Sequence, residues 1–232
     1  MFPEICKIGP FTIYSYGLML VAAFSVGTFF AAREAKRQGL SPDLIFNLTF
    51  IAFISGIIGS RLFFVVENLD AYLNNPLEII MLQHGGLSWF GGLILGSISG
   101  LVFLKIKKAP VLNPLDILAP YIALAQAVGR VGCFLNGCCG GTIFNGIPVQ
   151  LVSSVLLLVI FFALRFMLRR PHLTGQIILT YLLLYSVKRF SIEFFRTDNP
   201  VIWARFTLFQ ILSAVLFIFS AVSLTLLKLR KK

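Results

Sequence analysis

The stretch GRVGCFLNGCCGG, residues 129–141, ends a run that otherwise has the apolar composition of a membrane-buried helix. It contains five glycines, three of the four cysteines, one arginine and one asparagine. Glycine allows close approach of a ligand or another helix because it has no Cβ. An arginine at the edge of an apolar span is costly unless it meets an anion, so Arg130 is a candidate functional residue. The alternative is a packed helix end from which Arg130 extends to the lipid headgroups.

The composition around this stretch indicates an integral membrane protein. The 232 residues are 58% hydrophobic and 12% charged, and their mean hydropathy is +0.91. These values exclude an ordinary soluble domain. Several continuous apolar runs are long enough to cross a bilayer as helices, whereas the ten-residue alternation of a membrane β-barrel is absent. The predicted fold is therefore all-α and polytopic.

Seven transmembrane helices are predicted, with the N-terminus outside and the C-terminus in the cytoplasm. Thirteen of the twenty lysines and arginines follow the first, third, fifth and seventh spans, which places them on one side of the membrane. The net charge of +11 therefore largely reflects basic residues on the cytoplasmic side of the membrane, and it does not indicate nucleic-acid binding. The connections are short, so residues 1–232 are expected to form a single membrane domain. The expected spans are about 11–32, 44–66, 87–104, 114–135, 148–168, 175–195 and 203–227.

Several charged residues lie inside these spans, toward the predicted outer side. Arg189, Glu193 and Arg196 have the spacing of one helical face. One glutamate cannot balance these two arginines together with Arg61 and Arg130, so the surplus positive charge predicts a bound anion. A phospholipid phosphate is the most available anion, and guanidinium binds it in a bidentate manner. The structural alternative is pairing of Arg189 and Arg196 with Glu193 alone.

Two further side chains have chemistry suited to such a site. His84 is a candidate proton carrier because imidazole titrates near neutrality, although a loop histidine is often simply solvated. Tyr16 lies near the outer start of the first span. It belongs either to the interfacial aromatic belt or to the arginine cavity, where its hydroxyl would donate to a phosphate oxygen.

An ordered set of motifs resembles the bacterial prolipoprotein diacylglyceryl transferase family almost from end to end. The matching segments are Tyr16–Met19, Gly59–Arg61, Gly85–Ile94, Asp116, Gly129–Gly137, Arg189, Glu193–Arg196 and Gln210–Ser213.

The resemblance implies a lipid-to-protein transferase in the bacterial inner (plasma) membrane, with its active site toward the outer leaflet. The family moves the diacylglyceryl group of phosphatidylglycerol onto the lipobox cysteine in the signal peptide of a preprolipoprotein, forming a thioether. Its implied partners are these two substrates and membrane lipids, without nucleic acid, cofactor or metal. Catalytic roles are expected for Arg130, Arg189 and Tyr16, and substrate-binding roles for Arg61, Asn136, Gly141, Glu193 and Arg196.

The chain also departs from the family pattern where protons are handled. Phe90 stands where the family usually has a histidine, Cys133 replaces an asparagine and Cys138 replaces a glutamate. The anion-binding half of the site is thus retained. The general base could be His84, Glu193 or Tyr16. Alternatively, the arginines alone would assist ionisation of the incoming thiol.

Two other functions remain as alternatives. A related lipid or acyl transferase would use Cys133, Cys138 or Cys139 as the acceptor, although these cysteines also suit packing or a disulfide. A non-catalytic transporter of anionic lipid would use the arginines as a pathway, but the internal repeat common in transporters is not apparent in the sequence.

Overall fold

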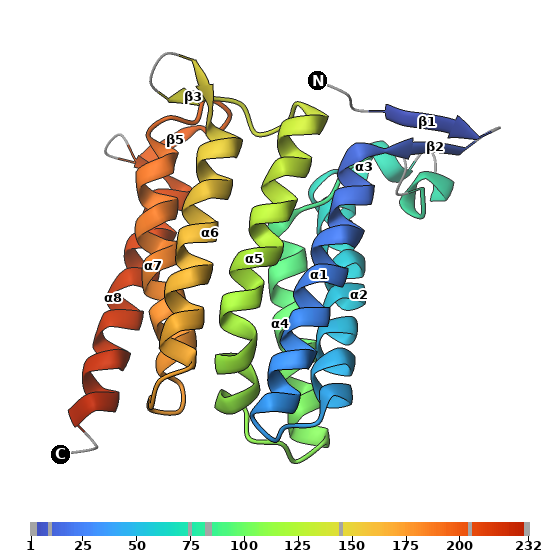
Figure 1. Cartoon of the computed structure of the whole chain (residues 1–232). Helices are drawn as coiled ribbons and strands as arrows, with labels where there is room; N and C mark the ends of the chain where they lie inside the picture. The colour runs from blue at the N-terminus through green and yellow to red at the C-terminus, as the bar shows by residue number, and fades with distance from the viewer. Residues whose placement is uncertain are drawn as a thin grey trace. The chain divides into compact units, whose positions relative to one another are not determined.

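The computed structural model of the chain describes residues 4–8, 11–73, 76–81, 85–143, 146–203 and 206–229. Long helices dominate it (Figure 1), so the all-α prediction is confirmed. They are α1 (Ser15–Arg37), α2 (Pro42–Glu67), α4 (Trp89–Ile106), α5 (Leu112–Asn136), α6 (Val149–Leu168), α7 (Gln176–Glu193) and α8 (Leu208–Leu229). Two short helices, α3 (Leu69–Leu73) and η1 (Pro76–Ile79), follow α2.

Among the described residues, six helices are long and apolar enough to cross a membrane. The sixth predicted span, about 175–195, corresponds to α7, which is not among these six and carries three charged residues, Lys188, Arg189 and Glu193, in its last two turns. The count of seven spans and the orientation of the termini stay predictions.

In the described residues, three antiparallel hairpins precede or interrupt the helices, and the sequence did not predict them. They pair β1 (Glu4–Ile8) with β2 (Phe11–Tyr14), β3 (Thr142–Ile143) with β4 (Ile147–Pro148), and β5 (Val201–Trp203) with β6 (Phe206–Thr207). The first and last predicted spans therefore begin several residues before the helices α1 and α8. The reason is that apolar residues of β2, β5 and β6 extend the apolar runs.

The chain folds as two compact units, residues 1–34 with 112–232 and residues 35–111. In the first unit, α5, α6, α7 and α8 lie side by side in chain order (Figure 1). Their core includes the fully buried Ile117, Leu157, Leu164 and Ile177. Large apolar side chains such as Phe162 remain exposed on these helices, as expected for surfaces that face lipid.

A buried carboxylate fixes the start of α7 in this unit. Asp116 on α5 is 1% exposed and accepts hydrogen bonds from the N–H groups of Gly175 and Ile178, the latter at 2.8 Å. A carboxylate is favoured there because the first N–H groups of a helix lack intrahelical partners and carry partial positive charge. Gly175 permits the turn before α7 because its φ is +90°.

The second unit is built on a seam of small residues between α2 and α4. Gly59 and Gly91 face each other so closely that a Cβ on either residue would overlap the backbone of the other. Ser55 and Ser99 hydrogen-bond across the same seam, with 2.6 Å between their Oγ atoms. Small residues allow this approach, which maximises van der Waals contact between helices in lipid.

Replacing Gly91 by alanine is predicted to destabilise the seam. The added methyl would overlap the Gly59 carbonyl and lie 2.6 Å from Phe63 Cβ, so we expect a loss of about 1–3 kcal/mol. Thermal unfolding in detergent would show this as a lower midpoint. Gly100→Ala is the matched control because its Cβ would make an ordinary 3.4 Å contact with Leu48. Equal midpoints for the two variants would contradict the prediction.

Candidate active site

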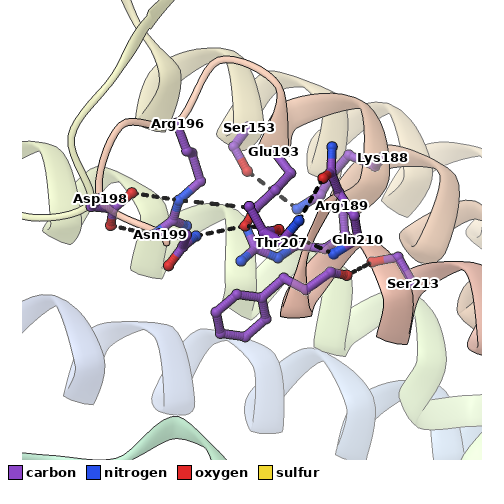
Figure 2. A network of polar contacts seen from close by, with 11 residues as sticks. Ser153, Lys188, Arg189, Glu193, Arg196, Asp198, Asn199, Thr207, Gln210 and Ser213 are labelled. Atoms are coloured by element: carbon purple, nitrogen blue, oxygen red, sulfur yellow. Dashed lines mark hydrogen bonds and ion pairs between the residues drawn. The ribbon is translucent and has the colours of Figure 1, made fainter. Parts of the chain in front are cut away.

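Glu193, the last residue of α7, organises the polar cluster of the first unit (Figure 2). Its side chain is fully buried, and Oε2 lies 2.8 Å from Arg189 Nη1 and 3.9 Å from Arg196 Nε. Its other oxygen, Oε1, accepts hydrogen bonds from Asn199 Nδ2 at 2.7 Å and Thr207 Oγ1 at 2.8 Å. A buried carboxylate is costly unless it is paired and hydrogen-bonded, and Glu193 is both.

The start of α8 supplies part of this support. The N–H of Thr207 donates to Gln210 Oε1 at 2.9 Å, and the N–H of Gln210 donates to Thr207 Oγ1 at 3.3 Å. This reciprocal pattern is the capping box of a helix N-terminus. The same Thr207 hydroxyl donates to Glu193, so the cap of α8 also fixes the carboxylate.

Arg189 and Arg196 share Glu193 as an ion-pair partner, and each has a further partner of its own. Arg189 is 8% exposed, and its guanidinium carbon lies 4.4 Å from the centre of the Phe209 ring. Arg196 forms a two-point contact with Asp198, at 2.9 Å and 2.5 Å. Burial opposes the charge of Arg196, but its hydrogen bonds and ion pair with Asp198 raise its pKa. The same contact overcomes burial at Asp198 and lowers the pKa of that carboxyl.

Two further cations near this cluster have no acidic partner among the described residues. Lys188 is 6% exposed, and its Nζ donates to Ser153 Oγ at 3.2 Å. Arg130, near the end of α5, is half-buried, and its charge acts on both Lys188 and Arg189. Four cations thus accompany two carboxylates, Glu193 and Asp198, in the described part of the cluster. The surplus positive charge suits an anionic ligand.

The turn after α5 brings the glycine–cysteine stretch against this cluster. Gly137 and Cys139 have positive φ values of 75° and 62°, so the chain reverses tightly there. Gly141 pairs with Arg196 as a β-bridge, and a Cβ on Gly141 would overlap the carbonyl oxygen of Phe195. Glycine is required at this position because the backbone approaches so closely and because φ is 135°.

Three cysteines gather at this turn. The Sγ atoms of Cys133, Cys138 and Cys139 all lie within 4.8 Å of one another. A hydrogen bond with Cys133, together with the charges of Arg130 and Arg196, outweighs burial and lowers the pKa of Cys139 to about 5. Burial and the neighbouring Cys139 raise the pKa of Cys138. One thiol of the cluster is therefore readily ionised.

The structure brings together most of the residues predicted for the site. Arg189, Glu193 and Arg196 are in direct contact, and Gly141 adjoins Arg196. Tyr16, at the start of α1, is half-buried. It lies near Gly132 of α5 and interacts with Arg130 and the three clustered cysteines. Asn136 interacts with the Cys138 side chain.

The remaining predicted residues belong to the second unit or fall outside the described residues. Arg61 belongs to the second unit, where its guanidinium donates to the carbonyls of Glu78, Ile79, Met81, Gly85 and Gly86. It also stacks on Tyr72, at 5.3 Å from the ring centre. These contacts brace the backbone that follows α2, and a direct lipid-binding role for Arg61 stays a prediction. Phe90 lies in the first turn of α4, also in the second unit, and His84 lies outside the described residues.

Several cluster residues were not assigned roles from the sequence. Lys188 was detectable as a second cation beside Arg189 in an apolar span, and the spacing of Thr207 and Gln210 is that of a capping box. Ser153, Asp198 and Asn199 carry no sequence signal of their own, because only the fold brings them to Lys188, Arg196 and Glu193.

Comparisons with known proteins agree on one family. The family model described as prolipoprotein diacylglyceryl transferase matches residues 3–226. A phosphatidylglycerol–prolipoprotein diacylglyceryl transferase of Staphylococcus carnosus is 33% identical over 236 residues, covering 92% of this chain and 86% of that protein. The protein of that name from Clostridioides difficile is 37% identical over 195 residues, or 79% of each chain. The one from Fusobacterium nucleatum is 47% identical over 141 residues, covering 59% of this chain and 48% of that protein.

Removing the charge of Glu193 is predicted to destabilise the cluster strongly. Glu193→Gln would leave Arg189 buried without its counter-charge, so we expect a loss of about 3–5 kcal/mol, measured by thermal unfolding in detergent. Asp198→Asn is the matched control, because Asp198 pairs with Arg196 at a partly exposed position and should cost at most about 1 kcal/mol. An Asp198→Asn loss as large as that of Glu193→Gln would show that Glu193 does not organise the cluster.

Proposed function

Because the chain belongs to the prolipoprotein diacylglyceryl transferase family, we propose that it transfers the diacylglyceryl group of phosphatidylglycerol to a cysteine thiol in the lipobox of a prolipoprotein signal peptide. This is the first step of lipoprotein lipidation. The observation that carries the proposal for this site is the surplus of buried and half-buried cations around Glu193, with Arg130 and Lys188 lacking acidic partners among the described residues.

The cations suit the leaving group of this reaction. The thiol sulfur bonds to the glyceryl carbon, and the bond from that carbon to the phosphate oxygen breaks, so negative charge grows on glycerol phosphate. Arg130 and Arg189 stabilise that charge because preorganised donors act strongly on a developing anion. Glu193 keeps Arg189 and Arg196 in place, and Tyr16 offers a hydroxyl donor beside Arg130.

An apolar groove beside the cluster suits an acyl chain of the lipid. It lies between α7 and α8, has a volume of about 350 Å³, and is lined by residues that include Val187, Phe190, Ala214 and Phe217. Phe190 follows Arg189 directly in α7, and Ala214 lies about one turn beyond Gln210 in α8. The groove and the cationic cluster thus occupy neighbouring turns of α7 and α8, which suits a lipid with an anionic headgroup.

The positions of the other cations support a membrane orientation for this unit. Arg165, Arg169, Arg170 and Lys228 lie at the ends of α6 and α8 opposite the cluster. The positive-inside rule places that end in the cytoplasm. We accordingly assign the protein to the bacterial plasma membrane, with the site toward the outer leaflet and the N-terminus outside.

The contacts of Glu193 disfavour it as the base that removes the thiol proton. Both of its oxygens already face donors or cations: Arg189, Arg196, Asn199 and Thr207. A carboxylate held in this way is a structural anion rather than a free acceptor. Thiol activation is therefore expected from the surroundings of Arg130, where Tyr16 and the cysteine cluster lie.

The lowered pKa of Cys139 favours a second candidate function. A low-pKa thiol beside two arginines is a competent nucleophile, so Cys139 could carry the lipid group covalently before transfer. The intact mass of protein purified after incubation with phosphatidylglycerol separates the two schemes. Direct transfer leaves the chain mass unchanged, whereas the covalent scheme adds a diacylglyceryl group.

Arg130 is predicted to be essential for transfer. Arg130→Gln removes a stabilising charge from the leaving phosphate, and we expect the rate of label transfer from phosphatidylglycerol to a lipobox peptide to fall about 100- to 1,000-fold. The control Arg169→Gln changes an exposed arginine at the opposite end of the unit and should retain transfer. Phosphatidylglycerol binding by the unmodified chain without any covalent product would instead support the lipid-transporter function.

Filling the groove between α7 and α8 is predicted to weaken lipid use. Ala214→Trp places a large side chain where the acyl chain is proposed to lie, so the KM for phosphatidylglycerol should rise roughly tenfold, or about 1.4 kcal/mol. Val215→Trp adds the same side chain to a neighbouring exposed position outside the groove. An unchanged KM in Ala214→Trp, or the same rise in Val215→Trp, would remove the groove from the proposal.

A further inference from the structure

We propose that Cys133, Cys138 and Cys139 bind a zinc ion as thiolates and leave its fourth position open to a substrate thiol. The three Sγ atoms lie within 4.8 Å of one another, and those of Cys138 and Cys139 are 3.9 Å apart. Zinc–thiolate bonds of about 2.3 Å in a tetrahedral arrangement separate two sulfurs by about 3.8 Å. One pair already has this spacing, and only small movements would bring in the third sulfur.

The local backbone explains how an unusual spacing forms such a cluster. Cys133 lies in the last turns of α5, whereas Cys138 and Cys139 follow the helix end. The positive φ values at Gly137 and Cys139 turn the chain back toward the helix. Gln150 on α6 fixes this turn by donating from Nε2 to the Cys138 carbonyl at 2.8 Å. The sequence predicted no metal because it lacks a pair of cysteines separated by two residues, but the fold brings the three thiols together.

The charges around the cluster suit a zinc–tris-thiolate. Three thiolates and Zn²⁺ carry one net negative charge, which Arg130 and Arg196 offset, because the charges of both arginines act on Cys139. A buried acceptor beside the turn points to the same occupant. Gln150 is 4% exposed, and its Oε1 has no hydrogen-bond partner among the described residues. A zinc-bound water is the kind of donor that Oε1 lacks.

The open position would allow the zinc to activate the substrate thiol, and this role rests on the proposed function. Zinc sites with three protein ligands keep a fourth position for water or substrate. The lipobox thiol replaces the water and releases its proton to solvent. The zinc-bound thiolate sulfur then bonds to the glyceryl carbon, while the electron pair of the breaking carbon–oxygen bond leaves with the phosphate oxygen. The thioether product is a weaker ligand than a thiolate and dissociates.

Cobalt(II) substitution tests the metal site without relying on activity. The full-length chain in detergent is reduced, stripped of metal with a chelator and titrated with Co²⁺ alone. We expect about one Co²⁺ per chain, with the visible bands of tetrahedral coordination and a sulfur-to-cobalt charge-transfer band. Zn²⁺ should displace the cobalt and remove both features.

The charge-transfer band should be lost or weakened in each of the variants Cys133→Ser, Cys138→Ser and Cys139→Ser. Cys6→Ser is the matched control, because Cys6 is exposed on β1, and it should keep the band. The zinc-site proposal would be overturned if the folded wild-type chain gave no such band. It would also be overturned if two of these thiols formed a disulfide under these reducing conditions.

A second arm separates this inference from the proposed function. Adding a lipobox peptide should intensify the charge-transfer band by supplying a further thiolate, whereas the same peptide with serine in place of cysteine should not. Transfer by the metal-stripped chain should fall and should recover with Zn²⁺. Undiminished transfer without metal would overturn the thiol-activating role while leaving the proposed function intact. A cobalt site that responds to the peptide, without any lipid transfer, would refute the proposed function and support the site.

Discussion

The ion pair between Glu193 and Arg189 is the constraint on which the polar cluster depends. Glu193 is fully buried, so it must be satisfied by partners from several directions. Those partners come from α7 itself, from the loop after it and from the N-terminal cap of α8. Satisfying one carboxylate therefore fixes the relation between α7 and α8. It also keeps two arginines in place next to Lys188 and Arg130, which have no acidic partner in the part of the chain that the structure describes.

In the proposed reaction, this arrangement separates two chemical tasks within one unit. The α7 side supplies positive charge in a fixed geometry, which suits a phosphate leaving group. The end of α5 supplies sulfur in a tight turn, next to Arg130 and Tyr16. The two sides meet where Gly141 pairs with Arg196. Loss of the Gly141 conformation would disturb both tasks, because no other residue type allows the turn and the close approach at once.

The sequence predicted the helical fold and most of the cluster because both leave strong local signals. Long apolar runs mark the helices, and a charged triplet at helical spacing marks Arg189, Glu193 and Arg196. The hairpins were missed because their apolar strands merge with the neighbouring spans. Lys188 received no role because its partner Ser153 is 35 residues away in the sequence. The cysteine cluster had no recognisable spacing, since it depends on backbone reversal at Gly137 and Cys139. Arg61 is a different case. The sequence marked it as a charge inside an apolar span, but its guanidinium donates to backbone carbonyls, and no sequence pattern identifies such acceptors.

If the groove between α7 and α8 holds an acyl chain, as proposed, its position has a consequence for how lipids reach and leave the site. Some of its walls, including Val187, Phe217 and Ile218, are substantially exposed, so the groove opens on the surface that faces lipid. A diacyl substrate can enter by lateral diffusion in the leaflet, and a lipid-modified product can leave by the same route without crossing water. Exchange is then a two-dimensional partitioning process, in which occupancy follows the mole fraction of the lipid in the leaflet. No water-side gate is needed for the hydrocarbon, and only the phosphate product must escape to the aqueous phase.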